Sequence, residues 1–212
     1  MMYWMRRVFW ILGLWVCLLL AGCQTPEKNV KGDAVDEGYT VIDARGTAVY
    51  LPRKPQRILT GNLTYDTIVA GLVPTDHLAA VNILDTDPQA SFFAEEAEKV
   101  PVKIYTFTSI PLETIIKTAP DLIIVPTWIA MDHVETYREL GYPVLVCQGP
   151  DSIEEAKAAI RLVAQALREE AAGEKIVAEM DRQLAEIDTV LAARTDRRPM
   201  GMLISQMQSY GG

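Results

Sequence analysis

Residues 111–125 read PLETIIKTAPDLIIV and place a short helical segment directly before an apolar one. The first part, residues 111–118, predicts a helix that Pro120 ends, because proline cannot continue a helix. The second part, residues 121–125, is apolar without alternation after its aspartate, which is typical of a strand buried on both faces of a parallel sheet. This helix–strand pair predicts an α/β fold.

The same alternation of strand and helix continues on both sides of this stretch. Further strands are expected at residues 57–60, 78–81, 102–105 and 143–147, and helices at residues 64–70, 92–99 and 131–140. Before them, two β-rich runs around ARG at residues 44–46 predict a hairpin over residues 39–51. We therefore predict an N-terminal α/β lobe over residues 39–150, with a mainly parallel sheet flanked by helices.

Beyond this lobe, residues 151–196 predict a helical connector. Residues 152–194 are helical in composition, and Gly173 is the only interruption. A helix over about residues 172–194 would be roughly 34 Å long, which suits a strut joining two lobes; a peripheral packing helix is the alternative. Residues 197–212 predict the first strand of a C-terminal lobe that is otherwise largely absent.

The N-terminus predicts export. In residues 1–22, two arginines precede an apolar run at residues 8–20, as in a secretory signal. This run is shorter than the roughly twenty apolar residues of a membrane-spanning helix. It ends in LAGC, which resembles a bacterial lipobox, so we expect Cys23 to carry lipid and to begin the mature chain. Residues 23–38 are polar and aperiodic, which predicts a flexible tether.

Composition and cysteine use exclude several classes of protein. The 212-residue chain has a formal charge of −8, which loss of the two signal arginines would change to −10, so a nucleic-acid partner is not expected. A hydrophobic content of 50% excludes a disordered chain. Cys147 would be the only thiol left beside the lipidated Cys23, and its apolar surroundings predict a buried, unreactive group without a disulfide.

Chemistry-bearing motifs are sparse. His77 and His133 each stand beside an aspartate, and we interpret them as solvated surface pairs, with no metal site. The sequence contains no Gly-x-Ser-x-Gly, Walker A or His-Glu-x-x-His motif, so a binding protein is favoured over an enzyme.

The order of these segments resembles the periplasmic binding proteins of ferric-siderophore, haem and cobalamin ABC importers. The most specific stretch is residues 110–124, which is similar to that family's Leu-Glu-x-Ile and Pro-Asp-Leu-Ile signature. QRI at residues 56–58 and LGYPV at residues 140–144 fit as well. The resemblance extends over about residues 41–212 and implies a ligand cleft between two lobes.

Ligands of open α/β sheets lie outside the carboxyl ends of the strands. The candidate contacts therefore follow the predicted strands: Asn62, Asn82, Tyr105, Phe107, Thr127, Trp128 and Gln148. Trp128 is the only tryptophan of the expected mature chain, and its flat face suits a macrocycle or a catecholate; a partly buried packing role is the alternative. The resemblance also implies that some relatives carry aromatic ligand contacts in the loop around Asp85; this chain has none there, which argues against haem or cobalamin.

The resemblance also implies that Glu113 docks onto arginines of a permease, where one complementary pair per lobe fixes the orientation. The alternative is a glutamate in the first turn of a helix, where its charge favours the helix dipole.

Together these features predict a lipid-anchored solute-binding protein of the cell membrane, facing the periplasm or the cell exterior. We expect a monomer without an intrinsic cofactor that captures an iron chelate and delivers it to the permease subunits of an ABC importer. A ferric siderophore is the favoured ligand, and haem or cobalamin are alternatives. A surface lipoprotein that binds proteins and has no transport role is the alternative from another class.

Overall fold

The computed structural model describes residues 38–106 and 109–193, and the fold is reported for these residues. The predicted hairpin is confirmed, because β1 (Tyr39–Ile42) pairs antiparallel with β2 (Ala48–Leu51). The turn between them passes through Gly46, whose φ of 79° lies in the region that favours glycine.

The main sheet has five parallel strands in the order β5-β4-β3-β6-β7. Their bounds are β3 (Ile58–Leu59), β4 (Leu78–Asn82), β5 (Lys103–Ile104), β6 (Leu122–Pro126) and β7 (Val144–Cys147). Every residue of β4, β6 and β7 is buried, as strands covered on both faces require. The parallel α/β lobe predicted from the apolar run at residues 121–125 is confirmed.

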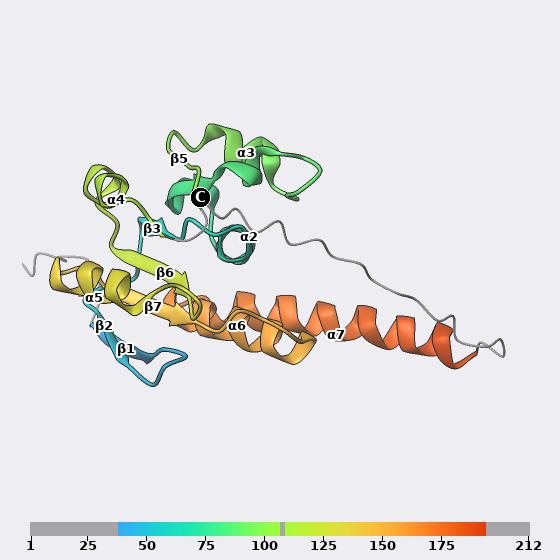
Figure 1. The fold of residues 1–212 in the computed structure, drawn as a ribbon. Coiled ribbons are helices and arrows are strands. Elements are labelled where there is room, and N and C mark those ends of the chain that lie inside the picture. The colour runs from blue at the N-terminus through green and yellow to red at the C-terminus, as the bar shows by residue number, and fades with distance from the viewer. Residues whose placement is uncertain (1–37, 107–108, 194–212) are drawn as a thin grey trace, which may run out of the picture. The chain divides into compact units, whose positions relative to one another are not determined.

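Helices cover both faces of this sheet (Figure 1). They are α2 (Leu63–Leu72), α3 (Ala94–Lys99), α4 (Leu112–Thr118) and α5 (Met131–Glu139), with the short 3₁₀ helices η1 (Thr75–His77) and η2 (Ile83–Thr86). One core cluster joins the sheet to α2, α3 and the hairpin, whereas the other joins it to α4 and α5. Neighbouring strand residues such as Ile123 and Ile124 point to opposite clusters, because side chains alternate along a strand.

The helical segment predicted over residues 151–196 contains α6 (Ile153–Ala166) and α7 (Glu170–Ala192). The expected interruption at Gly173 is wrong, because Gly173 lies inside α7. The chain instead turns at Arg168, which has a φ of 50°. Gly173 serves close packing: a Cβ at this position would lie only 2.6 Å from Ala164 Cβ.

Helix α3 starts two residues later than predicted. The helix expected from residue 92 begins at Ala94, and this leaves Phe92 outside it with a fully exposed side chain. An aromatic residue therefore does stand in the segment between β4 and α3, although not beside Asp85.

Several sequence predictions lie outside the described residues: the signal at residues 1–22, the lipidation of Cys23, nearly all of the tether, Phe107, and the strand in residues 197–212. Among the helices that the structure describes, none combines the length and the apolar character needed to cross a membrane.

Candidate functional site

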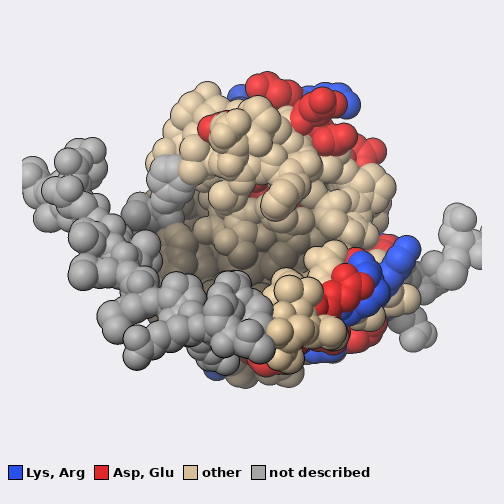
Figure 2. Space-filling view, turned by 90° about the vertical axis from the view of Figure 1, so that its right-hand side faces the viewer, with Lys and Arg blue, Asp and Glu red and all other residues tan. Residues whose placement is uncertain are grey.

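The strand order creates a topological switch point in the sheet. From β3 the chain runs outward through β4 to β5, and it then returns to the other side of β3 to form β6 and β7. The loops after β3 and β6 therefore leave the sheet in opposite directions and open a crevice between them. The arrowheads of β6 and β7 point to the right in Figure 1, and Figure 2 shows that this side is hollowed and lined mainly by uncharged side chains.

Three of the predicted contacts come together at this edge. Thr127 follows β6, its N–H donates to the Cys147 carbonyl at 2.9 Å, and its hydroxyl lies 3.4 Å from Gln148 Oε1. Trp128 is 56% exposed. A Cβ at Gly149 would lie 3.6 Å from Trp128 Cδ1, so one edge of the indole packs on the backbone after β7 while much of the ring stays open to solvent.

The two asparagines shape the loops beside this crevice. Asn62 caps α2, and its side chain accepts a hydrogen bond from the Thr64 N–H at 3.0 Å. Asn82 is fully buried; its amide donates to the Gly61 carbonyl at 3.3 Å and accepts from the Leu84 N–H at 3.0 Å. In this structure Asn82 therefore holds two loops together and has no surface to offer a ligand.

Tyr105 follows the edge strand β5 and is 70% exposed. Three strand spacings separate β5 from β6, a distance of about 14 Å at roughly 4.8 Å per spacing. A ligand that touches both Tyr105 and Trp128 must therefore have the size of a metal chelate or a macrocycle.

Glu113 lies in the first turn of α4 and is exposed. It lines a depression of about 310 Å³ together with Tyr105 and Lys117. The predicted docking residue thus lies near one predicted ligand contact and on a different element from Trp128.

A buried carboxyl pair was not foreseen from the sequence. Asp66 of α2 and Asp85 of η2 are both fully buried, and their carboxyl groups lie against each other. Asp66 accepts hydrogen bonds from the Thr60 hydroxyl and from the Asn82 N–H. Apart from the neighbouring Asp66 carboxyl, neither oxygen of Asp85 has a hydrogen-bond partner among the described residues. The one feature of the sequence that could have indicated this pair is Asp66, an aspartate among the apolar residues of a predicted helix.

The electrostatics of this pair follow from its burial. Desolvation and then the neighbouring carboxyl raise the pKa of Asp66 well above its usual range, and desolvation raises the pKa of Asp85. Within the described ranges, neither carboxyl forms an ion pair with a lysine, arginine or histidine. The pair therefore retains a proton at a pH where an exposed aspartate has lost it.

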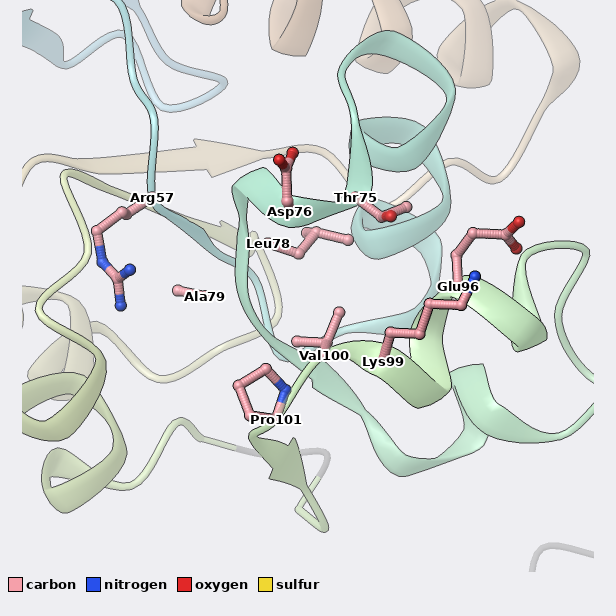
Figure 3. A pocket seen from close by; sticks show the side chains of 9 residues that line it. All are labelled: Arg57, Thr75, Asp76, Leu78, Ala79, Glu96, Lys99, Val100 and Pro101. Atoms are coloured by element: carbon pink, nitrogen blue, oxygen red, sulfur yellow. The ribbon is translucent and has the colours of Figure 1, made fainter.

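A shallow pocket of about 390 Å³ lies at the opposite, amino end of the strands (Figure 3). Charges of both signs surround an apolar floor there, with Arg57 and Lys99 as the cations. The Arg57 guanidinium already donates to the Thr118 carbonyl at 2.6 and 3.0 Å. This pocket does not coincide with any predicted contact residue.

Reactive groups are few in the described part of the chain. The structure shows no group there of three or more histidine, cysteine, aspartate or glutamate side chains that could hold a metal ion. Cys147 is buried as predicted, and desolvation raises the pKa of its thiol, which keeps the sulfur protonated and unreactive.

A family model described as "Periplasmic binding protein" matches residues 58–210. The chain belongs to the periplasmic binding protein family. The curated ABC transporter substrate-binding lipoprotein YvrC of Bacillus subtilis (strain 168), itself described as uncharacterized, is 25% identical over 189 residues. That match covers 86% of this chain and 58% of YvrC.

Solved structures share the fold of this periplasmic binding protein. A periplasmic solute binding protein from Veillonella parvula DSM 2008 has a TM-score of 0.66 at 19% identity and covers 77% of this chain. The siderophore binding protein BauB gives 0.59 at 23% identity over 76% of this chain, and the heme binding protein HmuT gives 0.61 at 23% over 80%. The matches span 51%, 57% and 54% of those chains, so this chain spans little more than half the length of its relatives.

Proposed function

We propose that this periplasmic binding protein serves an ABC importer by capturing a ferric siderophore and delivering it to the permease subunits. The observation that carries the proposal is the exposed indole of Trp128 at the topological switch point, where this fold offers a ligand surface. YvrC is described as a substrate-binding lipoprotein, and BauB was solved with two acinetobactin molecules and ferric iron, which adds support.

The N-terminal residues are proposed to anchor the protein to the membrane. Residues 1–22 are removed as a signal, and Cys23 then carries the lipid that attaches the mature protein to the outer face of the cell membrane. The polar residues 23–38 act as the tether between that lipid and the lobe. We further propose that residues 151–196 connect the lobe to a second one, whose first strand is predicted in residues 197–212.

Within the site, we assign ligand contact to the residues that end β5, β6 and β7: Tyr105, Phe107, Thr127, Trp128 and Gln148. Asn62 and Asn82 position the loops, since the first caps α2 and the second is buried. Aromatic side chains after β5 and after β6, three strand spacings apart, suit a chelate with flat aromatic groups, such as a catecholate.

Ligand capture can be measured through Trp128 alone. In the full chain with Trp4, Trp10 and Trp15 replaced by phenylalanine, Trp128 is the only fluorophore of its kind. We expect iron(III) tris(2,3-dihydroxybenzoate) to quench its emission saturably with a Kd of about 1 μM, or roughly −8 kcal/mol. Replacing Trp128 with alanine should weaken binding about tenfold in equilibrium dialysis, because a stacking surface is lost.

Haemin, cyanocobalamin and a ferric trihydroxamate serve as competing probes in the same titration. Tighter binding of haemin or cyanocobalamin than of both ferric chelates would replace the siderophore assignment. Absence of binding by all four probes would contradict the transport proposal and favour a lipoprotein that binds other proteins.

Permease docking through Glu113 gives a separate prediction. Glu113→Lys should weaken association with the importer's permease in liposomes by about tenfold, because one complementary charge pair becomes a repulsive one. The wild-type association should also weaken as salt is raised. Chelate binding, read from the emission of Trp128, should change less than docking, since Glu113 lies on α4 and shares a depression with Tyr105 but not with Trp128.

Glu95→Lys on the exposed surface of α3 is the matched control, because it makes the same charge change on another element. Equal loss of association in both variants would show that total charge, and not the position of Glu113, controls docking.

A further inference from the structure

The turn of the β1–β2 hairpin reaches the edge of the sheet that carries Trp128. Arg45 lies in this turn, and its Nη2 donates to the Thr127 carbonyl at 2.6 Å and lies 3.5 Å from the Ile129 carbonyl. These two residues are the chain neighbours of Trp128. One guanidinium group therefore holds the backbone on both sides of the indole.

The backbone of this turn is held in place by hydrogen bonds to the rest of the lobe. The fully buried carboxylate of Asp43 accepts the N–H groups of Arg45 and Thr47 at 2.9 and 2.8 Å through Oδ1. Its other oxygen accepts from Arg138 of α5 at 3.0 Å, and the Ala44 N–H donates to a β7 carbonyl at 2.8 Å. Two elements of the lobe thus fix the backbone from which the Arg45 side chain extends.

The bonding pattern of Arg45 differs from that of an ordinary surface arginine. In residues 38–106 and 109–193 its guanidinium has no carboxylate partner, and its hydrogen bonds go to main-chain carbonyls. Those carbonyls belong to residues just past the end of β6. The Thr127 N–H still donates to the Cys147 carbonyl of β7, whereas the Thr127 and Ile129 carbonyls face the hairpin and contact Arg45. A side chain that binds two such carbonyls restricts the loop between them.

We infer that Arg45 is the positioning residue for Trp128: it fixes the loop after β6 so that the indole presents a preformed surface at the switch point. The role in ligand binding rests on the proposed function, whereas the contact between Arg45 and the loop of Trp128 is independent of it. A preformed surface loses less conformational entropy when a ligand binds, so affinity depends on Arg45 even without direct contact.

The test separates the position of Trp128 from ligand binding. In the full chain with Trp128 as the only tryptophan, Arg45→Gln should raise the acrylamide quenching constant of the ligand-free protein about twofold, because the loop becomes more mobile. The Kd for iron(III) tris(2,3-dihydroxybenzoate) should rise about fivefold to tenfold. Arg53→Gln, at an exposed arginine just after β2, is the matched control and should change neither value.

Arg45→Lys distinguishes geometry from charge and serves as a second variant if Arg45→Gln fails to fold. Lysine keeps the charge but lacks the planar fork, so its quenching constant should resemble that of the glutamine variant. Wild-type quenching in both folded variants would overturn the inference. Full affinity in the lysine variant despite raised quenching would assign Arg45 a charge role and overturn it as well. Raised quenching without chelate binding in any variant, wild type included, would support the positioning role and contradict only the proposed function.

Discussion

Gly173→Ala is expected to destabilise the fold by about 2 kcal/mol, although glycine-to-alanine changes inside helices are usually stabilising by up to roughly 1 kcal/mol. The added Cβ would lie 2.6 Å from the Cβ of Ala164, which is itself fully buried on α6. Real Cβ atoms do not approach so closely, so α6 and α7 must separate and lose packing against the core. Urea unfolding followed by circular dichroism measures the loss.

Two further variants isolate this contact. Gly71→Ala on α2 is the matched control, because its new Cβ would meet Ile176 at an ordinary 3.5 Å; it should be neutral or stabilising. Ala164→Gly combined with Gly173→Ala should recover part of the loss, since one methyl is exchanged for the other across the same contact. If Gly173→Ala is as stable as Gly71→Ala, the close approach of α6 and α7 is wrong.

The second large effect is a dependence of stability on pH that arises from Asp66 and Asp85. The pKa of each is raised in the folded state, so the stabilising contribution is complete below the ordinary aspartate pKa of about 3.9 and is lost as the pH rises toward the folded value. Each proton that only the folded state retains lowers the free energy of unfolding by about 1.4 kcal/mol per pH unit in that interval. We therefore expect stability to fall as the pH rises above the ordinary aspartate pKa and toward the raised values of the folded state.

Among the described residues, the hydrogen-bond donors to the pair do not contribute to this pH dependence. The groups that contact the two carboxyls are the Thr60 hydroxyl and the Asn82 N–H, neither of which titrates in this range. The charged residues of α3, which packs on η2, are exposed: Glu95, Glu96, Glu98 and Lys99.

Asp85→Asn tests the assignment because its amide can donate permanently to the Asp66 carboxylate in place of the shared proton. The pH slope of the unfolding free energy should shrink by about one proton, and the stability of the variant relative to wild type should rise with pH. Asp188→Asn on the exposed surface of α7 is the control and should keep the wild-type slope. Identical slopes in Asp85→Asn and wild type would refute a shared proton.

Local patterns predicted the secondary structure well, and their errors have physical causes. The apolar run at residues 121–125 identified a buried parallel strand, because a strand covered on both faces has no solvent-facing side that needs polar residues. Gly173 was misread because a glycine can mark either a break in a helix or a close contact between two helices, and the sequence alone does not distinguish the two. Nothing in the sequence predicted the turn at Arg168, because the positive φ of this arginine is imposed by the packing around it.

The candidate site was predictable only in part. Residues that follow strands can be named from the strands themselves, which is why Thr127, Trp128 and Gln148 were found together. Burial of Asn82 and the partnership of Asp66 with Asp85 depend on which loops pack against each other, and strand order alone decides that.

The sequence by itself determined the α/β class, the parallel strands, the two helices after the lobe and the family, because each depends on periodicity or on a contiguous motif. The tertiary structure alone decided that a hairpin arginine contacts the loop of Trp128, that two aspartates share a buried space, and that a glycine allows α6 and α7 to touch. These are contacts between residues distant in sequence, and no local pattern encodes the distance between them once the chain has folded.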